Sequence, residues 1–271
     1  MSDRPRPPSV LDAILAKTRE RVASERERRP LSSCHPAVRQ APPVRPFGAA
    51  LVRPGRVSVI AEHKRRSPSR GAIREDLLPA DVAHRYEAAG AAAISVLTDE
   101  AFFGGRMAHL EEVRAATTLP VLRKDFVLDP WQVWEARAAG ADAILLIVAA
   151  LTDNELSGLL AVTREAGLDA LVEVHDRGEL DRALGAGSRI VGANSRDLKT
   201  LAVSLEATLA LAPAIPDDVV AVAESGIRTG ADVRRLRDAG FDAFLVGEHL
   251  MKAPDPGEAL RQLVAEAESA P

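Results

Sequence analysis

One phrase recurs four times along the chain and limits the folds that the chain can adopt. Each copy is a helix-forming run that ends in Ala-Gly, followed by a short polar link and a run of apolar residues. The copies lie at 87–97 (EAAGAAAISVL), 137–147 (RAAGADAILLI), 164–174 (REAGLDALVEV) and 237–247 (RDAGFDAFLVG). Glycine suits the left-handed residue that closes a helix, and a short apolar run is typical of a parallel strand buried on both faces. The pattern predicts alternating helices and strands.

Helix starts follow these strands as regularly. DPWQ at 129–132, TDNE at 152–155 and DPGE at 255–258 each place a capping side chain three residues before Glu or Gln. The whole chain yields eight strand candidates, near 57–64, 92–98, 119–125, 142–149, 169–175, 189–195, 219–225 and 242–248. This count predicts an α/β fold, a (β/α)8 TIM barrel. A doubly wound open sheet is the alternative, but no G-x-G-x-x-G follows the first strand.

The first 56 residues precede the barrel pattern. Val10, Leu11, Ile14, Leu15 and Val22 recur at helical spacing, which favours a helix docked on the protein over a membrane-surface helix. Residues 39–56 have the composition of a linker. We therefore expect an N-terminal helical extension and linker over 1–56 and the barrel over 57–271, as a single domain overall.

Charge and composition narrow the classes of partner. The 271 residues carry a net charge of −4, so no global charge attracts nucleic acid or an anionic membrane. Cys34 is the single cysteine of the sequence, which fits a reducing compartment and excludes a zinc–cysteine cluster. No apolar run approaches the roughly 20 residues of a membrane-spanning helix. The N-terminus is Arg-rich, but its acidic residues and its lack of an apolar core argue against a targeting peptide. We expect a cytoplasmic protein.

Charged residues gather where the predicted strands end, which is where barrel enzymes carry their chemistry. The group is Glu62 and Lys64 on the first strand, Lys124 on the third, Glu173 on the fifth, Asn194 on the sixth and Glu224 on the seventh. Residues two apart on a strand share a face, so Lys124 accompanies Phe126, and Glu173 accompanies Leu171, on an inward face. Buried charges are costly unless they are paired or used. The pattern favours an acid–base site over a structural ion network.

The loops after the last two strands indicate a phosphate site. Gly226 and Gly247 directly follow these strands, and barrels often bind phosphate there through backbone N–H groups and the start of a short helix. Ser67 and Ser69 of the first loop add hydroxyl donors, and Lys64 adds charge.

Seven fragments, in order and spacing, resemble the indole-3-glycerol phosphate synthase family over nearly the whole chain. They are VIAEHKRRSPSRG (59–71), SVLTDEAFFGG (95–105), LPVLRKDF (119–126), ALVEVHD (170–176), VGANSRDLKTL (191–201), VAESGI (222–227) and LVGEHLM (245–251). The resemblance implies that 1-(2-carboxyphenylamino)-1-deoxyribulose 5-phosphate closes to indole-3-glycerol phosphate with loss of CO₂ and water, in tryptophan biosynthesis. It implies a carboxy-lyase that uses no metal and no organic cofactor.

The resemblance also implies residue roles. Lys124 is the general acid of ring closure, Glu173 its partner acid/base, and Lys64 binds the substrate carboxylate and shares later proton transfers. Glu62, Asn194 and Glu224 orient the lysines and the sugar hydroxyls. The phosphate end matches Ser67, Ser225, Gly226, Gly247 and Glu248, the last through its backbone N–H, and the wall of the aromatic ring matches Phe103, Phe126 and Leu145. How the two lysines divide the acid roles stays open.

Two histidines stand near these residues. His63 occupies a position that is usually apolar in the resembling family, and alternation turns it outward to a packing or hydrogen-bonding role. His175 ends the fifth strand near Glu173, and its position favours a loop histidine over one that reaches the site. The histidines form no metal-ligand spacing.

Three other functions are compatible with the pattern. Two inward lysines also suit a Schiff-base aldolase, the related phosphoribosylanthranilate isomerase acts by acid–base chemistry without releasing CO₂, and a silent phosphometabolite sensor needs only the phosphate loops. The matched acids and bases favour the synthase. We expect a small phosphorylated substrate as partner, no nucleic acid, no membrane, and a monomer or weak homo-oligomer.

Overall fold

Eight parallel strands close into a barrel, which confirms the predicted fold. The computed structural model describes residues 9–196 and 202–269, without the side chains of residues 33–35. The barrel order is β1-β10-β9-β8-β7-β6-β5-β4. The strands are β1 (Ser58–His63), β4 (Ala93–Leu97), β5 (Val121–Lys124), β6 (Ala143–Ile147), β7 (Asp169–Val174), β8 (Ile190–Asn194), β9 (Val220–Glu224) and β10 (Ala243–Val246). Each lies within one of the eight predicted segments.

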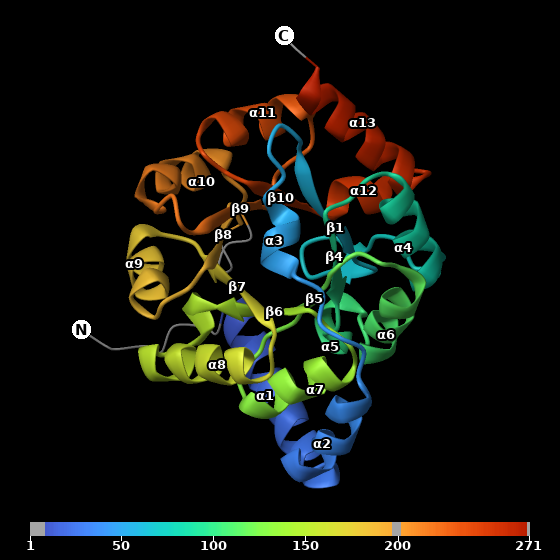
Figure 1. Cartoon of the computed structure of the whole chain (residues 1–271), viewed down its shortest axis with the longest axis vertical. Helices are drawn as coiled ribbons and strands as arrows, with labels where there is room; N and C mark the ends of the chain where they lie inside the picture. Colours follow the sequence, from blue (N-terminus) through green and yellow to red (C-terminus); the bar gives the residue numbers. More distant parts are fainter. Residues whose placement is uncertain (1–8, 197–201, 270–271) are drawn as a thin grey trace, which may run out of the picture.

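Helices surround the barrel and connect its strands (Figure 1). They are α4 (Pro79–Ala88), α5 (Glu100–Phe103), α6 (Met107–Ala116), α7 (Pro130–Ala138), η1 (Val148–Ala150), α8 (Asp153–Glu165), α9 (Arg177–Gly185), α10 (Leu205–Leu211), η2 (Ala212–Ala214), α11 (Gly230–Asp238), α12 (Glu248–Lys252) and α13 (Pro256–Glu268). Asp129, Thr152 and Asp255 cap α7, α8 and α13, as the sequence predicted. The four glycines of the repeated phrase all have positive φ, at 85°, 86°, 73° and 107°, so they terminate their helices in the left-handed conformation.

Apolar side chains form two layers of core, one inside the barrel and one between the strands and the helices. Alternation along the strands sends Ile60, Leu122, Leu171 and Val222 into the barrel, where all four are fully buried. Their neighbours on the outward faces pack under the surrounding helices. The inner layer fills the barrel up to the carboxyl ends of the strands, and charged residues begin there.

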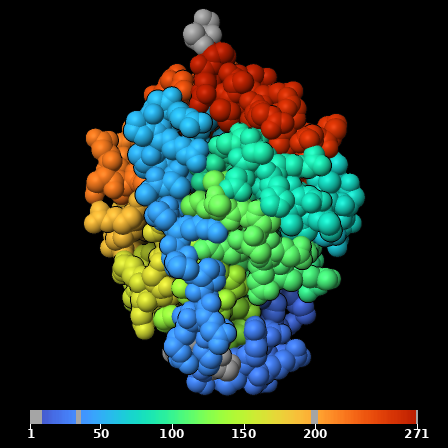
Figure 2. Space-filling view, turned by 45° about the vertical axis from the view of Figure 1, so that its right-hand side comes forward, coloured from blue at the N-terminus to red at the C-terminus, as the bar shows by residue number. Residues whose placement is uncertain are grey.

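The N-terminal extension packs along the barrel with three helices, α1 (Val10–Arg28), α2 (Leu31–Gln40) and α3 (Phe47–Leu51). Leu11, Ile14 and Leu15 of α1 are buried against the inner core, which confirms the prediction of a docked helix. Within the described ranges, no helix is both long enough and apolar enough to cross a membrane. Figure 2 shows the blue segment after α1 running over the surface from α2 toward β1.

Residues 39–56, predicted as a linker, connect α2 to β1 and also contribute to the core. The segment contains α3, whose Phe47 and Leu51 are both fully buried in the same core as the barrel interior. The Gly48 N–H donates a hydrogen bond to Asp169 Oδ2 (2.9 Å) at the start of β7. In Figure 1, α3 lies over the centre of the barrel. The helix therefore closes the end opposite the charged strand ends.

A small hairpin in the first βα loop was also not predicted. Strands β2 (Arg66–Ser67) and β3 (Gly71–Ala72) pair antiparallel directly after β1. Two-residue strands carry no periodic signal in a sequence. The hairpin shapes the loop that carries Ser67, Ser69 and Arg70.

Candidate active site

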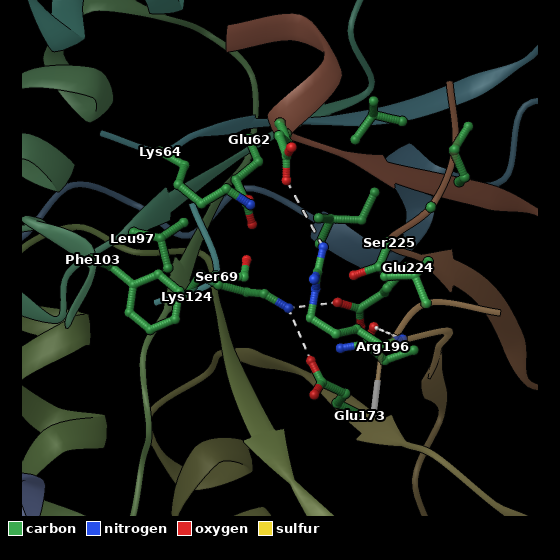
Figure 3. A pocket seen from close by; sticks show the side chains of 18 of the residues that line it. Glu62, Lys64, Ser69, Leu97, Phe103, Lys124, Glu173, Arg196, Glu224 and Ser225 are labelled. Atoms are coloured by element: carbon green, nitrogen blue, oxygen red, sulfur yellow. Dashed lines mark hydrogen bonds and ion pairs between the residues drawn. The ribbon is translucent and has the colours of Figure 1, made fainter. Parts of the chain in front are cut away.

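A cavity of about 750 Å³ opens at the carboxyl ends of the barrel strands. The structure brings all six predicted acid–base residues to its wall: Glu62, Lys64, Lys124, Glu173, Asn194 and Glu224. Five of them occupy one of the last two positions of their strands, and Lys64 directly follows β1, so all six lie just above the apolar filling of the barrel. Figure 3 shows Lys124 reaching into the cavity between Glu173 and Glu224.

Lys124 lies at the centre of the site. Its Nζ lies 3.0 Å from Glu173 Oε2 and 2.5 Å from Glu224 Oε2. We call Lys124, Glu173 and Glu224 the inner cluster. Burial alone lowers the pKa of Lys124, but the carboxylates of Glu173, Glu224 and Glu62 outweigh burial and raise this pKa above its ordinary value. The ammonium is therefore charged at neutral pH.

The two carboxylates of the inner cluster have pKa values shifted in opposite directions. Burial raises the pKa of Glu224 to about 7, and Lys124 offsets this only in part because Glu173 and Glu62 add negative charge. Burial also acts on Glu173, but Lys124 and His175 outweigh it and lower the pKa of Glu173. Glu224 Oε1 is buried without a hydrogen-bond partner among the described residues. Two acids whose pKa values are pushed apart are a common acid–base arrangement.

Glu62 near the end of β1 and Lys64 directly after this strand form a second pair. Lys64 Nζ lies 2.7 Å from Glu62 Oε1, and both side chains are largely buried. Glycines make room for two of the site carboxylates: a Cβ at Gly247 collides with Glu62, and a Cβ at Gly192 collides with Glu224. Small residues on β8 and after β10 thus shape the charged floor of the cavity.

His175 lies in the loop directly after β7, as predicted, and is not among the described residues that line the cavity, but it contacts a carboxylate of the site. Its Nε2 lies 3.3 Å from Glu173 Oε1, and its Nδ1 lies 3.0 Å from Glu179 Oε2. Burial lowers the pKa of His175, but the two carboxylates outweigh burial and raise this pKa to about 10. The spacing E-x-H-x-x-x-E was visible in the sequence, and the second acid four residues after His175 is the signal that would have found it.

The loops after β9 and β10 form a separate part of the cavity wall. Ser225 and Gly226 have positive φ, at 64° and 77°, and Ser225 is the one non-glycine residue of this kind in the described ranges. Both residues line the cavity. Gly247 and Glu248 line the same wall at the start of α12.

The predicted phosphate site did not include the cationic side chains of this wall. Arg70 Nε and Lys252 Nζ lie 3.2 Å and 2.6 Å from Glu248 Oε1, and Arg196 Nη2 lies 3.9 Å from Glu248 Oε2. All three cations line the cavity. Ser69 lines the cavity as well, whereas Ser67 is not among its described lining residues and lies behind, with its Oγ 3.4 Å from Ser69 Oγ.

The opposite side of the cavity is apolar. Phe103 and Phe126 lie with ring centroids 6.3 Å apart, and Leu145 lines the same wall. Phe103 lies across the cavity from Ser225 and Arg196 (Figure 3). An elongated ligand with a flat ring at one end and an anion at the other fits this division. Within the described ranges, no group of three or more His, Cys, Asp or Glu side chains is arranged to hold a metal ion.

A closed (β/α)8 barrel with acid–base residues at its strand ends places the chain in the class of TIM-barrel enzymes. Solved structures agree on this fold. A thiamine phosphate pyrophosphorylase from Pyrococcus furiosus has a TM-score of 0.59 at 18% identity, covering 80% of this chain and 98% of that chain. A mandelate oxidase variant has a TM-score of 0.59 at 22% identity, covering 79% of this chain and 72% of that chain. At this identity the likeness concerns the fold alone.

Sequence comparison identifies the family. The family model for indole-3-glycerol phosphate synthase matches residues 11–263. Synthases of this name from Polaromonas sp. strain JS666 and Aromatoleum aromaticum are each 49% identical over 257 residues, covering 94% of this chain and 97% and 98% of theirs. That from Albidiferax ferrireducens is 48% identical over 261 residues, covering 95% of this chain and 99% of its own. The chain belongs to the indole-3-glycerol phosphate synthase family.

Proposed function

We propose that the cavity converts 1-(2-carboxyphenylamino)-1-deoxyribulose 5-phosphate to indole-3-glycerol phosphate, CO₂ and water, as the tryptophan-pathway family does. The observation that carries the assignment of roles is the inner cluster, an ammonium held between two carboxylates of unlike pKa. It lies between an aromatic wall and an anion-binding wall. This order matches a substrate with a carboxyphenyl ring at one end and a phosphate at the other.

Ring closure begins at the sugar carbonyl. The aromatic carbon that bears the carboxylate attacks the carbonyl carbon, and the Lys124 ammonium gives a proton to the oxygen, which becomes a hydroxyl. The bond to the carboxylate then breaks, and its electron pair restores the aromatic ring as CO₂ leaves. Phe103, Phe126 and Leu145 hold the ring, and the Lys64 ammonium pairs with the carboxylate until it departs.

Dehydration completes the indole. A base takes a proton from the ring CH₂ next to the nitrogen while an acid protonates the hydroxyl that leaves the neighbouring carbon. The double bond of the indole forms between these two carbons, one water leaves, and no electrons are gained or lost. Glu173 is ionised and suits the base, and Lys124 or Lys64 supplies the acid. Glu224, with a pKa of about 7, exchanges protons readily at neutral pH. Glu62 and Asn194 orient the lysines and the sugar hydroxyls.

The phosphate lies on the wall formed by the loops after β9 and β10. Backbone N–H groups of Ser225, Gly226, Gly247 and Glu248 face the anion, and Ser69 supplies a hydroxyl in place of the more recessed Ser67. Three cations supply positive charge there: Arg70, Arg196 and Lys252. They now pair with Glu248, and we propose that a bound phosphate shares them with this carboxylate.

One experiment tests the assignment against its alternatives. Incubation with the synthetic substrate is expected to give indole absorbance in the ultraviolet and one CO₂ per product. An isomerase gives a product without CO₂, and a sensor binds in calorimetry without turnover. A Schiff-base aldolase is trapped as a covalent lysine adduct by borohydride, but an amine with a raised pKa between two carboxylates is a poor nucleophile. Absence of indole, or a borohydride adduct on Lys124, contradicts the proposal.

We further propose that the protein acts in the cytoplasm as a monomer or weak homo-oligomer. Support comes from its single cysteine and its modest net charge of −4. Light scattering of the purified chain at micromolar concentration is expected to give a mass of one chain. A stable larger assembly contradicts this part.

A further inference from the structure

Glu173 is bracketed by two cations, one on each carboxylate oxygen. Lys124 Nζ lies 3.0 Å from Oε2, and His175 Nε2 lies 3.3 Å from Oε1. The Glu173 side chain is only 3% exposed, so water supplies little of its solvation. The second oxygen therefore depends on the imidazole for a counter-charge.

His175 is in turn held by α9. Glu179 Oε2 accepts a hydrogen bond from the His175 backbone N–H (2.8 Å) and contacts its ring Nδ1 (3.0 Å). Asp176 fixes Glu179 by accepting a hydrogen bond from its backbone N–H (2.9 Å). A carboxylate at each ring nitrogen favours the doubly protonated imidazolium: Nδ1 is within hydrogen-bond distance of Glu179, and Nε2 forms an ion pair with Glu173 without a hydrogen bond.

His175 is not among the described residues that line the cavity, so it acts through Glu173. We infer that His175 and Glu179 form a positioning pair. Glu179 holds a positively charged His175 imidazole beside the Glu173 carboxylate while Lys124 gives up its proton. This inference rests on the proposed function. It adds a charge-compensating pair to that site.

The reason lies in the charge balance of the proton transfer. When Lys124 donates its proton to the carbonyl oxygen, the ammonium becomes a neutral amine beside two buried carboxylates. Uncompensated buried charge opposes the transfer. A fixed imidazolium behind Glu173 reduces the negative potential at Lys124, so the ammonium is a stronger acid. Without that imidazolium, the same carboxylates raise the pKa of Lys124 further and slow the step.

Charged groups from four elements face this pair. Glu173 from β7 and Glu179 from α9 raise the pKa of His175, against the effect of burial. Lys124 from β5 and Glu224 from β9 lie beyond Glu173 in the inner cluster. Asn194 from β8 is neutral and hydrogen-bonds to Glu173. The imidazolium is thus expected to persist at neutral pH only while both of its carboxylates are present.

The test uses His175→Gln and Glu179→Gln in the full chain. His175→Gln keeps a hydrogen-bond donor but no charge, and its kcat is expected to fall about tenfold at every pH with KM little changed, the size of one pKa unit in an acid. Glu179→Gln lowers the pKa of His175 from about 10 toward neutrality. Its kcat is expected to match wild type in mild acid and to fall to the His175→Gln level as pH rises to 9.

Arg177→Gln is the matched control. It removes a cation two residues away, but Arg177 is exposed and pairs with Asp181 (2.8 Å), so its pH profile is expected to follow wild type. An NMR titration of the His175 imidazole reads its charge without any turnover. Wild-type kcat in His175→Gln overturns the inference, and so does a Glu179→Gln profile parallel to wild type or a neutral imidazole at pH 7. Should Glu173→Gln keep full activity, the proposed role of Glu173 fails instead.

Discussion

Two charge clusters lie back to back across strand β5, and they differ in how completely their polar atoms are satisfied. Lys124 points into the barrel, while Arg123 and Asp125 point outward under α7. We call Arg123, Asp125 and Glu135 the outer cluster. Both clusters are buried and both combine one cation with two carboxylates. Composition therefore does not distinguish the structural cluster from the catalytic one.

In the outer cluster, each nitrogen of the cation has a partner within the protein. Arg123 is fully buried, and each nitrogen of its guanidinium has a partner: Thr98 Oγ1 at 3.2 Å, the Gln132 carbonyl at 2.7 Å, and the carboxylates of Asp125 and Glu135, both at 2.9 Å. Planar, multiply bonded arginine is typical of structural ion networks. Among the described residues, Arg123 and Glu135 do not line the cavity, although Asp125 does. Glu135 Oε2 is held by the ion pair with Arg123 rather than by a hydrogen bond.

The inner cluster faces open space and contains a carboxylate oxygen without a partner in the described ranges. It borders the 750 Å³ cavity, Glu224 Oε1 has no partner among the described residues, and the pKa of Glu224 is raised toward neutrality. Lysine, a single point charge, leaves room for a substrate to enter the arrangement. Incomplete satisfaction next to open space marks the cluster that does chemistry, and the substitutions below test that contrast.

Lys124→Met is expected to have the largest effect on turnover. It removes the ammonium while keeping the side-chain length, and loss of a general acid lowers kcat by about 10²- to 10⁴-fold. The thermal midpoint is expected to fall less than in the Arg123 variant below, because Glu224, whose pKa is already raised to about 7, takes up a proton when its cation is lost. Indole formation and a thermal melt measure both. Wild-type turnover in a folded variant contradicts the role.

Arg123→Met is expected to show the reverse. It leaves Asp125 and Glu135 buried without their shared cation, which costs about 3–5 kcal/mol of unfolding free energy. Turnover per folded molecule is expected to change only a few-fold. Urea unfolding gives the first quantity and a titrated active-site assay the second. A loss below 1 kcal/mol would mean that the outer cluster is not structural.

Much of this arrangement was predictable from the sequence, for a definite reason. Strands such as 142–149 and helix stops such as Gly140 have strong local signals, and inward parity assigns Lys124 and Glu173 to one face without coordinates. Contacts between distant segments have no such signal. Arg70, Arg196 and Lys252 meet at Glu248 only because the barrel closes, and Phe47 fills the barrel from a segment that has the composition of a linker.

His63 adds to the comparison because its side chain points outward from the barrel, like the outer cluster, and yet its ring nitrogens have no hydrogen bonds to described residues. Both ring nitrogens are buried without partners among the described residues, and the ring packs edge-on against His109 with centroids 5.8 Å apart. The structure thus confirms a packing role for His63 and gives it no hydrogen bond. Burial, then the charges of His109 and Arg65, lower the pKa of His63 to about 4.

The sign of the resulting pH effect follows from linkage. Between about pH 6.5 and pH 4 the unfolded chain binds a proton at His63 that the folded chain does not, so stability falls as pH falls through this window. The loss amounts to about 3.5 kcal/mol at most, from roughly 1.4 kcal/mol per pKa unit. His63→Leu is expected to remove most of this slope between pH 7.5 and pH 4.5 in urea unfolding. His84→Gln, at an exposed site, serves as the control, and an unchanged slope in His63→Leu refutes the account.

Arg21→Gln is expected to have the smallest effect. Arg21 of α1 reaches Asp125 at 3.2 Å, but its side chain is 31% exposed and Asp125 keeps Arg123. A pair at the edge of solvent contributes under about 1 kcal/mol, and kcat is expected to stay within twofold of wild type. A large loss of either quantity would mean that the outer cluster depends on α1 to stay intact.

The short helix α3 leaves the barrel interior closed at the amino-terminal ends of its strands. Because Phe47 and Leu51 close one end, substrate and products are expected to pass through the opening at the other end, where the described residues form the cavity. The CO₂, the water and the bicyclic product leave by the same opening through which the next substrate molecule enters. Product release must therefore precede substrate binding in each catalytic cycle.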